Sequence, residues 1–217
     1  MVEIIWHGHA CFEVRGEDGT VVTDPFRGVG LPEPEAQADL VLCSHSHFDH
    51  NNADPVKKPG GVVLEGFVGS RRVGNISVRG VASHHDEAGG ARRGRNSVYV
   101  FTLDGLGFCH LGDLGHGLDA AAINAIGELD VLFTPVGGVY TVGPNVAADI
   151  CRKLRPRVVF PMHYRMPGMS STFDALSTVG DFLRVCGTAD IRKIGKPAYS
   201  LTKETLPREQ MVIVLSL

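Results

Sequence analysis

Three histidines and one aspartate stand within six residues, in the pattern His45-x-His47-x-Asp49-His50. This segment follows the apolar run Leu40–Cys43, which is typical of a buried strand. On extended backbone, side chains two residues apart point the same way, so His45 and His47 can bind one metal ion together. If the backbone turns at Asp49 and His50, both side chains can reach a second ion beside the first. The loop therefore predicts ligands for two metal ions.

Three further points along the chain supply candidate ligands for such a centre. His85 or His84 would complete a three-histidine set for the first ion, and only one of them is expected to bind because adjacent side chains at a strand end diverge. His163 would join the ligands of the second ion. Asp113 follows a glycine, where a carboxylate can approach closely, and is suited to bridge both ions.

These donors are imidazoles and carboxylates without a thiolate, which suits Zn²⁺, Mn²⁺ or Fe. Two such ions about 3.5–4 Å apart hold a bridging water and lower its pKa towards ~7, and the hydroxide that forms is a nucleophile at neutral pH. The sequence thus predicts metal-assisted hydrolysis of a small-molecule substrate. The expected cofactor is two divalent metal ions, zinc first, with manganese or iron as alternatives. Asp49 and Asp113 are the expected catalytic carboxylates.

Short strand-like runs must position these residues. Each candidate point follows one of them, and the points are His7/His9, Asp24, His45–His50, His84/His85, Asp113 and His163. Ligands in layered α/β folds gather beyond the carboxyl ends of strands, so we expect these tips to meet at one sheet edge. Helices are predicted over 119–126, 144–154 and 172–185. Strands come first and then alternate with helices, which predicts an α/β or α+β layered domain.

The composition is that of an ordinary globular protein, with 217 residues of which 43% are hydrophobic and 21% charged. We expect one domain over residues 1–217. The net charge of -3 gives no general attraction to nucleic acid. The five cysteines are scattered without a C-x-x-C pair, which fits a reducing compartment. We find neither a leader pattern nor an apolar run of membrane-spanning length, so we expect a cytoplasmic protein without a membrane partner. The oligomeric state, including a homo-oligomer, stays open.

The chain resembles the metallo-β-lactamase superfamily, whose hallmark is H-x-H-x-D-H followed by distal His, Asp and His. The branch looks like the small metal-dependent hydrolases related to ascorbate-6-phosphate lactonase. The stretches that carry the resemblance are Trp6–Phe12, Thr23–Phe26, His45–Asn51, His85–Asp86, His110–His116, Pro135–Gly138 and Pro161–Tyr164. The resemblance implies a four-layer αβ/βα sandwich of two mixed sheets with helices on the outer faces and the site at one edge.

The resemblance also implies a ligand set. It assigns one ion to His45, His47 and His85, the other to Asp49, His50 and His163, and the bridge to Asp113, and it thereby favours His85 over His84. The superfamily often has a glycine shortly after the loop motif. This chain has Asn51-Asn52-Ala53 there, so the exit of the loop is expected to differ while its ligands remain.

Several nearby residues have two interpretations each. His9 lines the substrate pocket or hydrogen-bonds a neighbouring loop. Asp24 accepts a hydrogen bond from a ligand histidine or caps the Asp-Pro turn. His116 either lines the site or belongs to a turn. The basic cluster Arg92, Arg93 and Arg95 either binds a phosphate or carboxylate of the substrate or lies in a solvated loop.

The first functional hypothesis is a dinuclear hydrolase in which a metal-bridging hydroxide cleaves a small ester, lactone or phosphodiester. A nuclease of the same superfamily is the second, and the net charge and the lack of a long basic arm stand against it. A diiron redox protein or a metal-binding module is the third. The resemblance to diiron relatives weakens at His47, where those proteins typically have glutamate.

Overall fold

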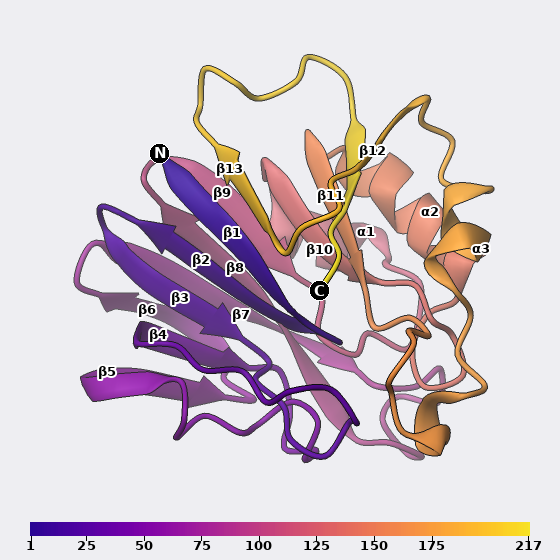
Figure 1. Ribbon diagram of the computed structural model, residues 1–217, viewed down its shortest axis with the longest axis horizontal. Coiled ribbons are helices and arrows are strands. Elements are labelled where there is room, and N and C mark those ends of the chain that lie inside the picture. The colour runs from indigo at the N-terminus through magenta and orange to yellow at the C-terminus, as the bar shows by residue number, and fades with distance from the viewer.

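The computed structural model describes residues 1–217 and contains two β-sheets that lie face to face (Figure 1). Both sheets are mixed, because each joins antiparallel neighbours to parallel ones. The six strands of the smaller sheet are, in spatial order, β13 (Ala198–Leu201), β1 (Val2–Gly8), β2 (Cys11–Gly16), β3 (Gly19–Thr23), β4 (Ala38–Cys43) and β5 (Lys57–Glu65).

The larger sheet has eight strands and lies behind the smaller one in Figure 1. In spatial order they are β12 (Asp190–Lys193), β14 (Met211–Val214), β11 (Val158–Met162), β10 (Val131–Pro135), β9 (Leu106–His110), β8 (Arg95–Leu103), β7 (Ile76–His84) and β6 (Gly69–Val73).

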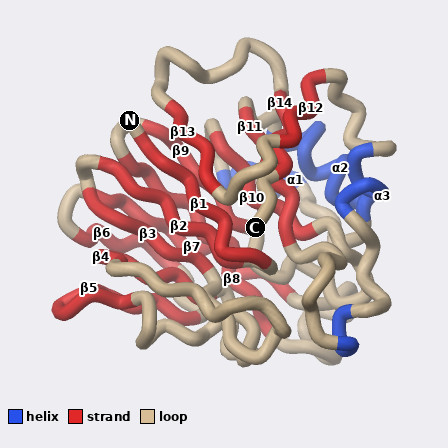
Figure 2. Tube along the Cα trace, viewed as in Figure 1, coloured by secondary structure: helices blue, strands red, loops and turns tan.

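The helices are α1 (Ala120–Ile126), α2 (Pro144–Leu154) and α3 (Val179–Leu183), and a 3-10 turn η1 spans Ser171–Phe173. Helix α1 contacts β7 and α2 contacts β10, so the helices accompany the larger sheet, on one side of the molecule in Figure 2. Helix α1 begins where the Asp119 carboxylate accepts a hydrogen bond from the N–H of Ala122 at 2.8 Å. No helix is long and apolar enough to span a bilayer.

Alternating side chains of the smaller sheet build two hydrophobic clusters. Phe12 and Leu42 belong to the main cluster between the sheets, where the Phe12 ring lies 4.3 Å from that of Phe133. Their chain neighbours Cys11 and Val41 belong to a second cluster on the opposite face. Loop residues rather than long helices complete that second cluster, and they are Phe26, Val29, Val56, Met169, Phe173 and Leu176. The predicted two-sheet sandwich is confirmed, with its helices concentrated on the larger sheet.

The strands that precede the candidate ligands point in matching directions within each sheet. Strands β1 and β3 flank the antiparallel β2, and β4 is parallel to β3. In the larger sheet β7 and β9 flank the antiparallel β8, and β10 and β11 continue parallel to β9. Their carboxyl ends therefore meet at one edge of the sandwich, and the loops that follow them can share one site.

Most of the predicted elements are confirmed, and α2 has the predicted bounds. The single helix predicted over 172–185 is wrong, because only η1 and the five residues of α3 are helical there. The chain between them leaves the helical path so that Phe173 and Leu176 can pack on the second cluster, and Thr178 then starts α3 with a capping box. Strands β6, β12 and β13 are not predicted, because their residues are mostly exposed or half-buried and show no apolar run.

A buried tyrosine connects the two sheets next to the site. The Tyr99 hydroxyl, from β8, lies 3.0 Å from the carbonyl oxygens of both Cys43 and Leu64 in β4 and β5. The same oxygen accepts a hydrogen bond from the N–H of Phe67 at 3.0 Å. The larger sheet is thereby attached to the backbone directly before the loop 45–50.

We expect Tyr99→Phe to lower the free energy of unfolding by about 1–3 kcal/mol, because buried carbonyl and N–H groups lose their partner. Urea denaturation measures the change. Tyr164→Phe is the matched control. Tyr164 is also buried, but its hydroxyl has no hydrogen-bond partner, and burial is the one cause that raises the pKa of this hydroxyl. Equal stability of Tyr99→Phe and the wild type would contradict the connection between the sheets.

Candidate metal centre

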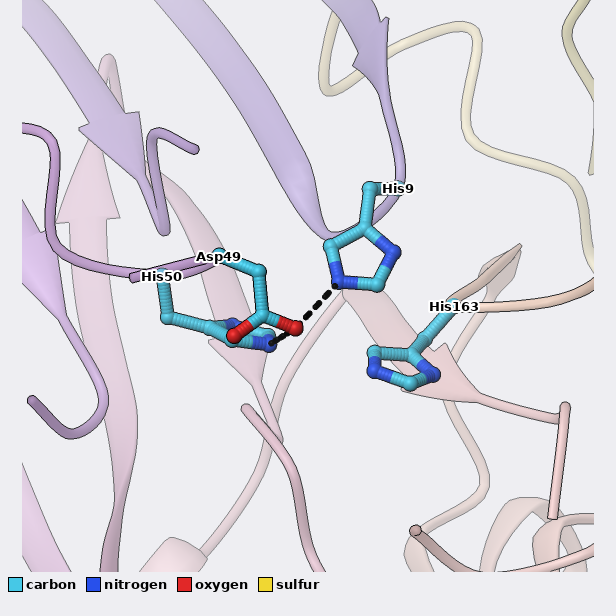
Figure 3. A group of neighbouring side chains, drawn as sticks. All are labelled: His9, Asp49, His50 and His163. Carbon is cyan, nitrogen blue, oxygen red and sulfur yellow. Dashed lines mark hydrogen bonds and ion pairs between the residues drawn. The ribbon is translucent and has the colours of Figure 1, made fainter. Parts of the chain in front are cut away.

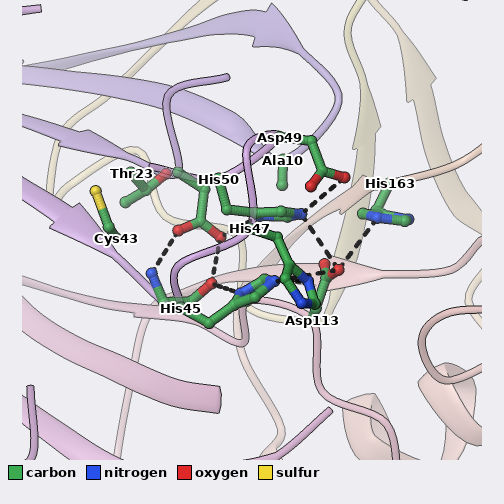
Figure 4. Close-up of polar contacts among 12 residues, drawn as sticks. Ala10, Thr23, Cys43, His45, His47, Asp49, His50, Asp113 and His163 are labelled. Atoms are coloured by element: carbon green, nitrogen blue, oxygen red, sulfur yellow. Dashed lines mark hydrogen bonds and ion pairs between the residues drawn. The ribbon is translucent and has the colours of Figure 1, made fainter. Parts of the chain in front are cut away.

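Asp113 is the point at which the predicted ligands meet. Its Oδ2 atom lies 3.2 Å from Nε2 of both His50 and His85. The same oxygen is 3.4 Å from Nε2 of His163 and 4.0 Å from Nε2 of His45. Figure 4 shows His45, His50 and His163 around this carboxylate. The four histidines follow strands of both sheets, so the fold brings the strand ends into one cluster.

His45, His47 and His85 form one group of ligand atoms within 4.8 Å of one another. Nε2 of His45 lies 2.9 Å from Nδ1 of His47. Ligand atoms at about 2.1 Å from a tetrahedral Zn²⁺ are separated by about 3.4 Å, so this spacing suits one shared ion. His45 and His85 are buried while His47 is exposed, so this group faces solvent through His47.

Asp49, His50 and His163 form a second group, again within 4.8 Å, and His9 belongs to it (Figure 3). Nε2 of His9 lies 3.3 Å from Oδ2 of Asp49, and the rings of His9 and His163 are 4.2 Å apart. His9 is fully buried, and its contact with Asp49 agrees with the interpretation that His9 hydrogen-bonds a neighbouring loop.

Asp24 fixes which nitrogen of two histidines is free to bind a metal. Its carboxylate accepts hydrogen bonds from Nδ1 of His50 at 2.9 Å and from the Ser44 hydroxyl at 2.8 Å. The Ser44 hydroxyl has one hydrogen and donates it to Asp24. Its oxygen therefore accepts a hydrogen bond from Nδ1 of His45, at 2.9 Å. Both imidazoles therefore carry their proton on Nδ1 and direct the lone pair of Nε2 towards Asp113. This is the usual arrangement behind metal-binding histidines.

The buried polar atoms of the cluster fit a bound cation. Nε2 of His50 and of His163 and Oδ1 of Asp113 are buried without a hydrogen-bond partner in the protein. Such atoms normally have partners. Nε2 of His50 also faces the Asp113 carboxylate at 3.2 Å, and two lone pairs at that distance repel unless a proton or a metal cation lies between them. Divalent metal ions would satisfy these atoms.

The electric field of the cluster favours positive charge. Burial alone would lower the pKa of His50, but the carboxylates of Asp113, Asp49 and Asp24 hold it well above its ordinary value. Burial would likewise raise the pKa of Asp113, but the His163 and His50 imidazoles keep it well below its ordinary value. At His45 burial dominates, aided by His50, and lowers the pKa to about 3, so this imidazole stays neutral. Deprotonated ligands are the form that binds metal.

Three site residues directly after strands adopt left-handed backbone. The φ angles are 49° at His9, 40° at Asp24 and 52° at His163. Residues with a Cβ atom enter this region at a cost of about 1–2 kcal/mol each. Backbone strain of this kind is concentrated at functional sites, where the surrounding contacts maintain it. Here the turn after each strand directs the side chain into the cluster.

Gly112 explains how Asp113 reaches the centre. Its φ is 56°, and a Cβ atom there would lie 2.4 Å from both Asn96 Oδ1 and the Cβ of Ser44. The N–H of Asp113 then donates to Asn96 Oδ1 at 3.0 Å. A glycine is needed at this point because Asn96 of β8 and Ser44, which follows β4, both lie against its backbone.

The structure brings neither His84 nor His116 into the cluster. The N–H of His84 donates to Nε2 of His116 at 3.3 Å, and the two rings are 5.8 Å apart. Nδ1 of His116 contacts the carbonyl oxygen of Gly117 at 2.8 Å. These two histidines therefore contact each other on the far side of the strand end from His85.

Sequence reasoning misses the supporting roles of Ser44 and Asn96, because single small polar residues carry no spacing signal. Ser44 is adjacent to the loop motif, and that adjacency is the one indication that the sequence offers. At the exit of the loop, the Asn51 side chain donates to the carbonyl of Ser46 at 3.2 Å. The N–H of Asn52 donates to the carbonyl of Pro25 at 2.8 Å, so asparagines close the turn where relatives often have glycine.

The family described as the beta-lactamase superfamily domain matches residues 3–163 of the chain, well over half of its 217 residues. The chain belongs to this family. Among its relatives is a UPF0173 metal-dependent hydrolase of Thermoplasma volcanium, 30% identical over an alignment of 202 positions. The match covers 81% of this chain and 86% of the relative. Its counterpart in Methanoculleus marisnigri is 34% identical over an alignment of 188 positions, and the match covers 75% of this chain and 81% of that protein.

A solved structure agrees with these relatives. It is the crystal structure of a candidate Zn-dependent hydrolase of the metallo-β-lactamase superfamily from Thermotoga maritima, with 36% sequence identity and a TM-score of 0.82. The match covers 99% of this chain and 98% of that one. The resemblance noted in the sequence is thus confirmed, and the protein is a metal-dependent hydrolase of the metallo-β-lactamase superfamily.

We expect Asp24→Ala to weaken metal binding by this hydrolase about 10–100-fold, because both His45 and His50 lose the partner that orients them. Ser44→Ala removes the hydroxyl contacts to His45 and Asp24 but leaves the contact between Asp24 and His50, so a smaller loss is expected. Competition with a chromophoric chelator measures both affinities, and circular dichroism verifies folding. Asp39→Ala, which removes a carboxylate from the surface of β4, is the control. Unchanged affinity in folded Asp24→Ala would refute its role in orienting the ligands.

Proposed function

We propose that the protein binds two divalent metal ions and hydrolyses a small ester, lactone or phosphodiester. The position of Asp113 carries this proposal. One oxygen of this carboxylate lies 3.2 Å from His85 of the first histidine group and 3.2 Å from His50 of the second. A shared oxygen between two ligand groups supports a bridging role. The remaining ligands would be His45 and His47 on the first ion, and Asp49 and His163 on the second.

The ions, zinc first and manganese or iron as alternatives, would supply a water of lowered pKa and a Lewis acid for the bond that is cleaved. The protein contributes the orientation. Asp49, held by His9 at 3.3 Å, presents its carboxylate to the cavity beside Asp113, where it can accept a hydrogen bond from the attacking water. Asp24 keeps His50 in the tautomer that leaves Nε2 free.

A cavity of about 260 Å³ opens over the ligand cluster and suits a small substrate. This volume corresponds to roughly nine water molecules. The residues that line it are His47, Phe48, Asp49, His85, Arg93, Asp113, Tyr140, His163, Thr172 and Phe173. Ligands of both groups thus face one space together with aromatic rings and one arginine. This combination supports hydrolysis of a compact molecule rather than of a polymer.

Metal analysis tests the dinuclear centre. The purified protein is expected to carry close to two metal ions per chain. Asp113→Ala is expected to lose metal and turnover, because the oxygen shared by both ligand groups is gone. Inductively coupled plasma mass spectrometry gives the metal content. His84→Ala is the matched control, since His84 lies outside the cluster. A variant Asp113→Ala with both ions and full activity would disprove the bridging role.

A substrate screen tests the reaction class. We expect the metal-loaded protein to turn over at least one member of a panel of esters, lactones and phosphodiesters. His47→Ala should lower kcat/KM by about 100-fold or more, because it removes a ligand. Turnover of none of them by protein with a full metal complement would speak against hydrolysis. A visible spectrum that responds to reductant would then favour the diiron alternative, and salt-sensitive RNA or DNA retention on a filter would favour the nuclease.

A further inference from the structure

We propose that Arg93 binds an anionic group of the substrate, so that this hydrolase acts on compounds that carry a carboxylate or phosphate near the bond that is cleaved. The inference rests on the proposed hydrolytic function and specifies its substrate class. The shared chemistry is an anion with at least two oxygens, which a guanidinium can bind with two parallel hydrogen bonds.

Arg93 is the basic residue that the cavity over the ligand cluster contains. It also lines an adjacent cavity of about 360 Å³ beside His45 and His47, so it lies where the two spaces meet. Arg93 is half-buried, while its neighbours Arg92 and Arg95 are exposed. Of the basic cluster seen in the sequence, Arg93 alone lines the cavity over the ligand cluster. Arg95 lines only the adjacent cavity, and Arg92 lines neither.

The backbone of Arg93 is anchored to the metal centre through Asp86. The Asp86 carboxylate accepts hydrogen bonds from the N–H groups of Ala88 at 2.8 Å and Gly90 at 2.9 Å through one oxygen. Its other oxygen accepts from the N–H groups of Arg92 at 2.9 Å and Arg93 at 2.7 Å. Because Asp86 directly follows His85, the loop that carries Arg93 has a fixed position relative to the ligand cluster.

The side chain of Arg93 lies over an aromatic ring from another loop. Its guanidinium carbon is 4.7 Å from the centre of the Tyr140 ring, within the range of a cation–π contact. The Tyr140 hydroxyl donates to the carbonyl of Thr172 at 2.9 Å, which holds the ring in place. A cation–π contact uses no N–H hydrogen bond, so the guanidinium N–H groups stay available to a ligand.

No acidic side chain of the protein uses these donors. Arg93 donates to Asp86 through its backbone N–H. The Asp86 carboxylate accepts four backbone N–H groups in all, that of Arg93 included. A half-buried guanidinium without an anionic partner retains up to five donors for a ligand. Since Arg93 and the ligand cluster line the same cavity, an anion on Arg93 would hold the rest of a small substrate against the metal site.

The other walls indicate where the remainder of the substrate lies. Phe48 and Phe173 face the same cavity and offer apolar surface, and Phe48 is 47% exposed at the rim. Asp49 and Asp113 belong to the metal ligands and so repel an anion less once cations are bound. A molecule with an anionic end, a short apolar body and a hydrolysable bond therefore matches the cavity.

Matched substrates test the proposal on the metal-loaded protein. We would compare the aryl ester of butyric acid with the aryl hemiester of succinic acid and with an aryl ester of phosphoacetic acid. The wild type is expected to prefer one or both anionic esters by about 10–100-fold in kcat/KM, the value of a charge-assisted hydrogen bond or two. Arg93→Ala should abolish this preference, mainly by raising KM for the anionic esters. Arg93→Lys should retain part of it.

Arg92→Ala is the control, because Arg92 has the same charge and the same loop but an exposed side chain. It should behave like the wild type. Equal kcat/KM for neutral and anionic esters in the wild type, or an unchanged preference in Arg93→Ala, would overturn the proposal. The dependence of each anionic ester on Arg93 decides between carboxylate and phosphate.

A binding measurement separates this proposal from the hydrolytic function. Calorimetric titration of succinate and of phosphoacetate into the metal-loaded protein does not depend on turnover. Any contact of these anions with the metals is common to wild type and Arg93→Ala, so the difference between them reports on the arginine. Tenfold weaker binding to Arg93→Ala without hydrolysis of any ester would sustain the anion site and reject the hydrolase. Equal binding of the anions to wild type and Arg93→Ala, together with ester hydrolysis, would reject the anion site and sustain the hydrolytic function.

Discussion

The burial of three carboxylates among imidazoles at one sheet edge is the constraint on which the site depends. Asp24 and Asp113 are almost fully buried, and Asp49 nearly so. Carboxylates without compensation are too costly to bury, so positive charge must accompany them. The raised pKa of His50 is one expression of this requirement, and it has the same origin as affinity for metal ions. Protons and divalent cations compete for the same lone pairs, so metal binding is coupled to deprotonation of the ligands.

The architecture supplies the contacts that maintain so unusual a cluster. Tyr99 fastens the two sheets together next to the first loop, and Asn96 and Ser44 meet at Gly112, where a Cβ atom would collide with both. His110 adds a further support, because its Nε2 contacts the carbonyl of Ala10 at 2.9 Å and its Nδ1 accepts the N–H of Gly112 at 3.1 Å. A rigid two-sheet core surrounds the strained turns at three strand ends, and its contacts offset the cost of the strain.

The parts of the fold and site that the sequence predicts are those with a local signal. Helix α2 has a proline at its first turn and a regular apolar face, so its bounds could be predicted. The ligand candidates are titratable residues directly after apolar runs, and such a pattern is visible without the fold. Asn96 and Tyr99 carry no such pattern, because their roles arise from contacts across the two sheets. Residue types alone do not decide between His85 and His84. The resemblance favours His85, and the structure places His85 rather than His84 beside Asp113.

The same distinction, between residues with a local sequence signal and residues whose roles arise from the fold, explains why family membership does not identify the substrate. The candidate metal ligands lie at strand ends, where the core fixes them, whereas the other cavity walls come from loops between elements. Arg93 and Tyr140 meet from two separate loops, and Thr172 joins them from a third segment. Arg93 belongs to neither hydrophobic cluster, so a relative can exchange it and keep every ligand. The chemistry of the bond is therefore a property of the superfamily, while the molecule that carries the bond is selected by residues such as Arg93.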